Sequence, residues 1–344
     1  MTLFPLLRPL VFALDAERAH RLTIAGLKAA PIGTPPPSPP ALGVRVAGLD
    51  FPNPVGLAPG FDKDAEVFSE MLGLGFGHVE IGTVTPLAQP GNPKPRLFRL
   101  TEDEAVINRM GFNNSGQLEA RDRLAKRDPK RGIVGANIGA NKDSGDRIAD
   151  YARGARLMAP VADYLTVNIS SPNTPGLRAL QDAAALTGLL GQVMAARGEN
   201  GPPVLLKLAP DLEPADIDAI ARVAIEAGVA ALIIGNTTIA RPPLKSRHAG
   251  EAGGLSGAPL APLARRRLAD FREATGGAIP LIAVGGIDSA EEAWARIRAG
   301  ASLVQLYSAL VYRGPGLARA IVKRLDALRE RDGFETIREA VGGI

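Results

Sequence analysis

Eight short apolar runs recur between residues 55 and 307, and stretches with helical spacing separate most of them. Ala- and Leu-rich segments at 216–227, 260–274 and 290–299 are examples. Parallel strands need a crossover connection, usually a helix, and closing the sheet removes its exposed edges. We therefore predict an α/β protein built as a single (β/α)8 TIM barrel. Its strands are expected at 55–58, 78–84, 133–138, 164–169, 204–208, 231–234, 280–284 and 303–307.

An N-terminal two-helix extension is expected before the barrel. The second helix should span 15–28, and a hairpin should follow at 42–55. Six of the ten residues in 31–40 are proline, which predicts a stiff, extended connector. We therefore divide the chain into a helical head with its linker, residues 1–40, and a barrel, residues 41–344. The first helix is indicated by aliphatic residues along one face: Leu3, Leu6, Leu7, Leu10, Val11 and Leu14.

Two environments are compatible with the amphipathic head. Either its apolar face packs on the rest of the protein, or the head lies in a membrane interface. No apolar stretch reaches the roughly 20 residues of a membrane span, and no cleavage site follows it, so we expect neither a transmembrane helix nor export. A positive head favours contact with an anionic leaflet. Its basic residues outnumber Asp15 and Glu17: Arg8, Arg18, Arg21 and Lys28.

Composition excludes several classes of site. The chain has no cysteine, which rules out disulfides, thiolate metal sites and cysteine nucleophiles and fits a reducing compartment. The three histidines, His20, His78 and His248, lack partners at ligand spacing, so we expect no metal. The net charge is +4, but basic residues are scattered among acidic ones and aromatics make up only 4%, so nucleic-acid binding is not expected.

Polar residues cluster just after the predicted strands, and TIM barrels carry their active sites at that end. The segment 167–176 combines amides and hydroxyls with two prolines. Amides pair with the edges of a small heterocycle while a hydroxyl handles a proton, although a polar turn capping a helix has the same composition. Further polar groups on this rim are Asp62, Lys63, Thr83, Thr85, Asn137, Lys207, Asn236, Thr237 and Thr238.

The last two strands end in residues typical of a phosphate site. Gly285 and Gly286 follow the seventh strand, and Tyr307 and Ser308 end the eighth, where such barrels bind phosphate. A glycine cluster at 253–257 is expected to complete the pocket wall. Lys207, at the end of an apolar strand, needs an anion, such as a reduced flavin. A Schiff-base lysine is the alternative.

Six motifs occur in order over almost the whole chain: 56–63 (GLAPGFDK), 80–85 (EIGTVT), 108–114 (NRMGFNN), 168–174 (NISSPNT), 253–257 (GGLSG) and 284–287 (VGGI). Together they closely resemble the dihydroorotate dehydrogenase family. The helical head resembles its membrane-associated, quinone-dependent class, class 2. The soluble classes use a cysteine as the base, and this chain has none.

The resemblance implies an FMN enzyme of pyrimidine biosynthesis, with one FMN per chain, that oxidises (S)-dihydroorotate to orotate. Ser171 would be the catalytic base for the C5 proton, with Thr174 and a water relaying it, while a hydride passes from C6 to flavin N5. Electrons would leave to a membrane quinone through a tunnel beneath the N-terminal helices. The protein would then be peripheral, on the cytoplasmic face of the cell membrane.

The same resemblance assigns the ligand-binding residues. Pro59 replaces a smaller residue, and Gly235 stands where a hydroxyl side chain is frequent, so the resemblance implies backbone contacts there. The FMN-binding residues would be Pro59, Gly60, Phe61, Asp62, Lys63, Thr83, Asn137, Asn168, Lys207, Gly235, Gly257, Gly286, Tyr307 and Ser308. The substrate-binding residues would be Lys63, Asn108, Arg109, Met110, Gly111, Phe112, Asn168, Asn173, Asn236 and Thr237.

Two other functions remain open at this point. Another FMN barrel would act on a different dihydropyrimidine or on a 2-hydroxy acid, but the latter needs a histidine base beside arginines, and neither His78 nor His248 lies in such a motif. A non-catalytic, membrane-tethered barrel that binds a phosphorylated metabolite would explain the head and the glycines. It would not explain Asn, Ser and Lys residues at four separate strand ends.

Overall fold

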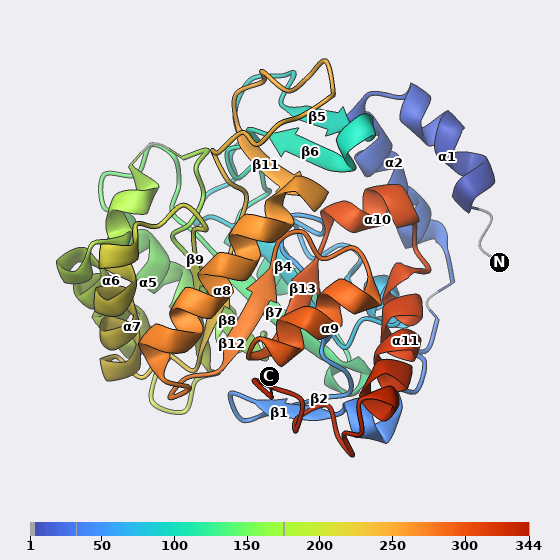
Figure 1. Cartoon of the computed structure of the whole chain (residues 1–344). Coiled ribbons are helices and arrows are strands. Elements are labelled where there is room, and N and C mark those ends of the chain that lie inside the picture. Colours follow the sequence, from blue (N-terminus) through green and yellow to red (C-terminus); the bar gives the residue numbers. More distant parts are fainter. Residues whose placement is uncertain (1–3, 32, 175, 344) are drawn as a thin grey trace.

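The predicted barrel is confirmed. The computed structural model describes residues 4–31, 33–174 and 176–343; Leu3 of the predicted apolar face and Pro175 of the polar segment lie outside them. Eight parallel strands close in chain order, with bounds within two residues of those expected (Figure 1). They are β3 (Val55–Leu57), β4 (His78–Val84), β7 (Ile133–Ile138), β8 (Tyr164–Asn168), β9 (Val204–Leu208), β10 (Ala231–Ile234), β12 (Leu281–Val284) and β13 (Ala301–Leu306).

Helices surround the barrel, as expected for a sheet buried on both faces. Short polar side chains fix several of their starts: Asp146 accepts a hydrogen bond from the N–H of Ala149, and Ser289 accepts one from that of Glu292. The helices are α3 (Phe68–Gly73), α4 (Gln117–Leu124), α5 (Arg147–Met158), α6 (Ala183–Arg197), α7 (Pro214–Glu226), α8 (Ala261–Thr275), α9 (Ala290–Arg298), α10 (Ser308–Arg313) and α11 (Leu317–Arg331). Single 3-10 turns occur at Pro40–Leu42, Thr101–Asp103, Pro129–Arg131, Leu177–Gln181 and Ala258–Leu260.

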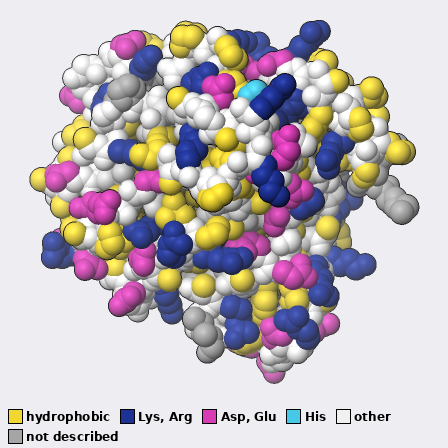
Figure 2. All heavy atoms as spheres, turned by 45° about the horizontal axis from the view of Figure 1, so that its top comes forward, with side chains coloured by type: hydrophobic (Ala, Val, Ile, Leu, Met, Phe, Trp, Pro, Cys, Tyr) yellow, Lys and Arg dark blue, Asp and Glu magenta, His cyan; other side chains and the backbone are white. Residues whose placement is uncertain are grey.

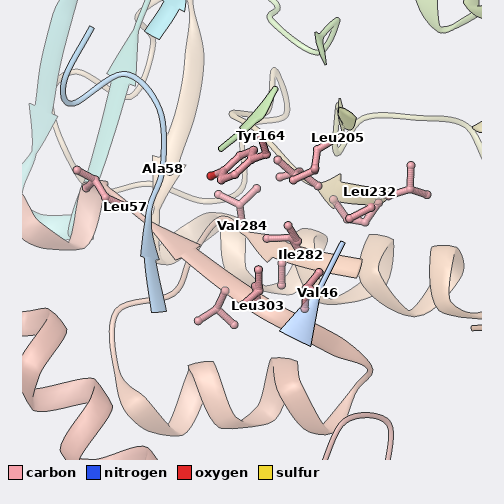
Figure 3. Packing of buried hydrophobic residues seen from close by; sticks show 14 of the residues in the cluster. Val46, Leu57, Ala58, Tyr164, Leu205, Leu232, Ile282, Val284 and Leu303 are labelled. Carbon is pink, nitrogen blue, oxygen red and sulfur yellow. The ribbon is translucent and has the colours of Figure 1, made fainter. Parts of the chain in front are cut away.

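The expected hairpin closes the N-terminal end of the barrel. It consists of β1 (Val44–Val46) and β2 (Leu49–Phe51) and lies at the bottom of Figure 1. Figure 3 shows Tyr164, Leu205, Ile282 and Leu303 packed together inside the barrel, with Val46 of the hairpin beside them. This end is apolar and sealed, so access to the barrel is from the opposite end.

A three-stranded antiparallel sheet stands above the barrel rim and was not predicted. Its strands are β5 (Leu97–Leu100), β6 (Ala105–Asn108) and β11 (Gly254–Gly257), in the order β11-β6-β5. It has a small core of its own, formed by Phe98, Leu100, Ala105, Ile107 and Leu255. The glycine cluster that we expected in the pocket wall mostly forms an edge strand of this sheet, and its Ser256 and Gly257 also line the cavity at the barrel rim.

The head consists of α1 (Phe4–Ala13) and α2 (Ala16–Ala29), at the upper right of Figure 1 beside α10 and β5. Asp15 accepts a hydrogen bond from the N–H of Arg18 and so begins α2. On the outer side, Leu6, Leu10 and Leu22 are 76%, 70% and 53% exposed. None of the helices in the described ranges is both long and apolar enough to cross a membrane. The division of the chain at residue 40 stays a prediction.

Candidate active site

A cavity of about 580 Å³ connects the barrel rim with the head. Its floor is polar, and its upper part is formed by helices of the head. The predicted site residues that line it are Pro59, Gly60, Phe61, Lys63, Thr83, Asn108, Met110, Gly111, Phe112, Asn168, Ser171, Asn173, Lys207, Asn236, Thr237, Gly257, Gly286, Tyr307 and Ser308. The head contributes Phe4, Leu7, Val11, Phe12, Ala16, Ala19, His20, Thr23, Gly26 and Leu27.

Hydrogen bonds across three adjacent strands lock the cavity floor. Asn168 Nδ2 donates to Thr83 Oγ1 at 2.9 Å and to Asn137 Oδ1 at 3.1 Å. Thr83 Oγ1 donates to Asn137 Oδ1 at 2.6 Å, and Asn137 Nδ2 donates to Glu80 Oε1 at 2.7 Å. Fully paired buried networks hold their members in one orientation. Thr83 and Asn168 are thus fixed at the cavity surface, with Asn137 and Glu80 behind them.

The loop after β8 carries Ser171, which is 6% exposed and lines the cavity. The backbone N–H of Asn173 donates to Ser171 Oγ at 3.2 Å, so this oxygen is held in place as an acceptor. Asn173 Nδ2 donates to Asn108 Oδ1 at 3.3 Å, and Asn236 Nδ2 donates to Ser170 Oγ at 2.6 Å. The amides of Asn108, Asn173 and Asn236, from three separate segments, therefore line the same cavity as Ser171.

Two lysines reach the floor with unusual environments. Burial lowers the pKa of Lys207 to about 8, and the Glu80 carboxylate opposes this shift. Lys207 is 3% exposed, and none of the hydrogen bonds or ion pairs found among the described residues includes its ammonium, on which Glu80 acts through its charge alone. Burial also lowers the pKa of Lys63 to about 8, while its Nζ donates to the carbonyl of Gly60 at 2.6 Å. An anionic ligand in the cavity would stabilise the charged form of both lysines.

The chain matches the family model described as dihydroorotate dehydrogenase over residues 41–328. It is 64% identical to the "Dihydroorotate dehydrogenase (quinone)" of Erythrobacter litoralis over 340 residues and 66% identical to that of Novosphingobium aromaticivorans over 347 residues. Each alignment covers 99% of both chains. The chain belongs to the dihydroorotate dehydrogenase family. The resemblance to its quinone-dependent class is thereby confirmed, and the enzyme is an oxidoreductase rather than a non-catalytic barrel.

Solved structures agree with the membership of this dehydrogenase family. The crystal structure of DHODH from Eimeria tenella in complex with ferulenol superposes with a TM-score of 0.90 at 38% identity. The match covers 96% of this chain and 95% of that one. The ligand-free form from the same organism gives the same TM-score at 39% identity.

Four residues predicted to bind ligands in this dehydrogenase do not line the cavity: Asp62, Arg109, Asn137 and Gly235. Asp62 accepts hydrogen bonds from the N–H groups of Glu66 and Val67 at 2.7 and 2.9 Å, and burial raises its pKa to about 6. Arg109 forms an ion pair with Glu251 at 2.8 Å. Their predicted roles would have to be exerted by backbone atoms or through a neighbour.

At the predicted phosphate end of the dehydrogenase cavity, Ser308 Oγ donates to Ser256 Oγ at 2.8 Å. Gly257 and Gly286 have positive φ of 98° and 72°. A Cβ atom at Gly286 would lie 2.5 Å from Ala261 Cα, and one at Gly257 would lie 2.4 Å from the carbonyl oxygen of Glu104. Close backbone packing alone thus requires both glycines, so they are not by themselves a signal for phosphate.

Several residues in or directly behind the cavity wall of this family member were not predicted as site residues, among them His20, Glu80, Arg99 and Tyr312. Arg99 donates to the carbonyl of Val11 at 3.1 Å, and Tyr312 packs edge-on against Phe12, 5.8 Å between ring centroids. Their partners lie in the head, so local sequence carried no signal for them. Glu80 did have a signal in the local sequence, because a carboxylate inside an apolar strand needs buried hydrogen-bond donors.

His20 marks the boundary between the two parts of the cavity. Its ring packs edge-on against Phe61 at 5.3 Å and lies 6.4 Å from that of Tyr307. Burial, with a contribution from the Lys63 charge, lowers the pKa of His20 to about 3. The ring is therefore neutral at physiological pH, and this boundary adds no positive charge to the cavity.

Proposed function

We propose that this enzyme oxidises (S)-dihydroorotate to orotate with FMN as cofactor and a membrane quinone as electron acceptor, in pyrimidine biosynthesis. The observation that carries the proposal is the convergence of Ser171, Lys207 and Asn236, from three separate strand ends, on one cavity that continues to the head. A cavity with a polar floor and an apolar upper part suits a polar substrate and a hydrophobic acceptor at its two ends.

The residues present fit FMN. The buried ammonium of Lys207 lacks a partner in the described protein, and the anionic reduced flavin would provide one. Thr83 and Asn168 offer oriented polar groups on the floor, while Gly257, Gly286, Tyr307 and Ser308 would hold the phosphate end. When bound, FMN supplies a hydride acceptor at N5. A Schiff-base role for Lys207 gains no support from this arrangement.

Ser171 is proposed as the base that takes the C5 proton of dihydroorotate. A hydroxyl is a weak base, so the protein must stabilise the charge that develops on the substrate. Lys63 and the amides of Asn108, Asn173 and Asn236 surround the same space and are placed to do so. Thr174, which is 4% exposed, is proposed to pass the proton outward with a water molecule.

The upper part of the cavity is proposed to admit the quinone. Val11 and Phe12 line it, Leu7 lines it at its edge and is 52% exposed, and Leu6 and Leu10 face the outside. Figure 2 shows hydrophobic side chains at the right edge, where the N-terminal helices lie, and interspersed acidic and basic side chains over the rest of that face. The head is thus proposed to occupy both environments at once. One side packs on the barrel, and the other contacts the cytoplasmic face of the membrane.

The visible spectrum of the purified enzyme tests this proposal directly. We expect a yellow protein whose flavin absorption bleaches when dihydroorotate is added without oxygen, and recovers when a quinone is added. A colourless protein that FMN fails to reconstitute would contradict the cofactor. A yellow protein that dihydroorotate leaves unbleached would contradict the substrate.

A further inference from the structure

A buried ion pair joins the head to a loop at the barrel rim. Arg96, which is 4% exposed, donates from Nε and Nη2 to the two carboxylate oxygens of Glu17 in α2, at 3.0 and 2.8 Å. The hydrogen bond with Arg96 lowers the pKa of Glu17 to about 2. The remaining nitrogen, Nη1, donates to the carbonyls of Pro90 and Asn92, at 2.6 and 2.8 Å. One guanidinium thus holds the head helix and this loop together.

The side chain of Asn92 continues this connection to the floor of the cavity. Its Nδ2 donates to the carbonyl of Arg109 at 3.0 Å and to that of Asn173 at 3.3 Å. Its backbone N–H donates to the carbonyl of Met110 at 3.0 Å. Asn92 therefore links the segments 108–112 and 171–174, which carry most of the proposed dihydroorotate-binding residues.

Close packing leaves little room for these segments to move independently. A Cβ at Gly91 would lie 2.3 Å from the carbonyl oxygen of Met110 and 2.8 Å from Arg96 Nη1. A Cβ at Gly111 would lie 2.8 Å from Asn92 Cγ. A displacement of Arg96 must therefore be passed on to its neighbours rather than absorbed in a void.

We propose that Glu17, Arg96 and Asn92 form a strut through which the head positions the dihydroorotate site. All three are positioning residues, and the inference rests on the proposed function in assigning 108–112 and 171–174 to the substrate. Loss of the Glu17 charge leaves a buried guanidinium without its counter-ion, which destabilises the arrangement of the loop. Coupling between two sites is reciprocal, so the substrate site in turn orders α2.

The test uses full-length, FMN-loaded enzyme in which Glu17→Gln is compared with Lys28→Met. Lys28 forms a separate ion pair from α2 to the barrel, with Glu66 at 2.8 Å, and shares no hydrogen bond or ion pair with Glu17, Arg96 or Asn92 among the described residues. We expect Glu17→Gln to raise the Kd for orotate, measured by calorimetry, about tenfold, equivalent to about 1.4 kcal/mol. Hydrogen exchange should accelerate at 89–96 and 108–112. Lys28→Met should change neither quantity.

Asn92→Asp tests the strut from its other end. It also provides a second test if the Glu17→Gln variant does not fold. It keeps the oxygen that accepts from Lys142 Nζ at 3.2 Å but removes both donations from Nδ2. We expect weaker orotate binding, and no further loss when it is combined with Glu17→Gln, because both changes break one connection.

Four results would overturn or reassign the inference. Additive effects of the two substitutions, or equal effects of Glu17→Gln and Lys28→Met, would overturn the strut. Faster hydrogen exchange in Glu17→Gln with an unchanged orotate Kd would show that the strut is only a structural contact. That result would overturn its role in positioning the dihydroorotate site. If the wild-type enzyme fails to bind orotate, the proposed function fails, and the exchange comparison still decides whether the strut exists.

Discussion

The two ends of the barrel are built from the same eight strands but on opposite principles. At the N-terminal end, Phe51 of the hairpin packs on His78, 5.1 Å between ring centroids, in a sealed apolar layer. At the C-terminal end, Asn168 and Lys207 extend polar groups from β8 and β9 into a cavity. The first end contributes stability, and the second retains a buried cation that makes the unliganded protein less stable.

This difference separates activity from stability. A substitution at the C-terminal end should alter chemistry and leave the fold intact, whereas one at the N-terminal end should do the reverse. Four changes test that separation.

Ser171→Ala should have the largest effect. The proposed base is lost, so the rate of flavin reduction by dihydroorotate should fall by about 10²–10⁴-fold, the usual contribution of general base catalysis. Anaerobic stopped-flow absorbance measures this rate. FMN content and the midpoint of thermal unfolding should stay at wild-type values. Reduction at near wild-type speed would show that another group takes the proton.

Phe51→Ala should lower the free energy of unfolding by about 3–5 kcal/mol, because it opens a cavity in the sealed layer. Phe51 is 3% exposed, and the nearby layer has little room to collapse. Urea unfolding measures the loss. The kcat of the folded fraction at low temperature should equal that of the wild type. A lower kcat with unchanged stability would break the proposed separation of the two ends.

Lys207→Met should raise the stability of the FMN-free protein and lower the midpoint potential of the bound flavin. Removing a buried cation should stabilise the FMN-free protein at pH 7 by about 1–3 kcal/mol, given the lowered pKa of this lysine. The same change should lower the midpoint potential of the bound flavin by about 30 mV, equivalent to about 1.4 kcal/mol for two electrons. Spectroelectrochemistry and urea unfolding measure the two effects. An unchanged potential would place the flavin away from Lys207.

A pH dependence at the sealed end provides the last test. Burial lowers the pKa of His78 from 6.5 to about 3, so between these values the unfolded chain binds a proton that the folded protein does not. Stability must therefore fall as the pH decreases through this window. In His78→Phe, unfolding free energies measured from pH 6.5 to 4 should decrease less steeply than in the wild type. Equal slopes would show that His78 accepts a proton in the folded state.

Local sequence was sufficient for the barrel strands and much of the rim. Apolar runs such as 204–208 are buried on both faces and need no particular partner to be recognised. The three-stranded sheet was missed because β5 alternates buried and half-buried residues over only four positions, and β11 begins and ends with glycine. Such strands form because they pair with β6, which local propensity does not reveal.

The predicted ligand-binding residues likewise divide into those that local sequence placed in the cavity and those that it did not. Lys207 was singled out because a lysine is unusual at the end of an apolar strand, and Ser171 was assigned by the family resemblance; both line the cavity. Arg109 carried an equally strong motif, yet its guanidinium pairs with Glu251, 142 residues away, outside the cavity. Side-chain direction within a loop depends on such distant partners, so the motif located the loop but not the orientation of each residue.

Periodicity and the positions of Gly, Pro and polar residues established the class of fold, the end that carries the site and the family resemblance, because these properties depend on neighbours along the chain. Tertiary structure alone decided that Glu17 meets Arg96 across 79 residues, that Lys207 is left without a partner in the described protein, and that the head completes the cavity. Those features arise from packing between elements remote in sequence, where burial and pairing are determined by the folded arrangement as a whole.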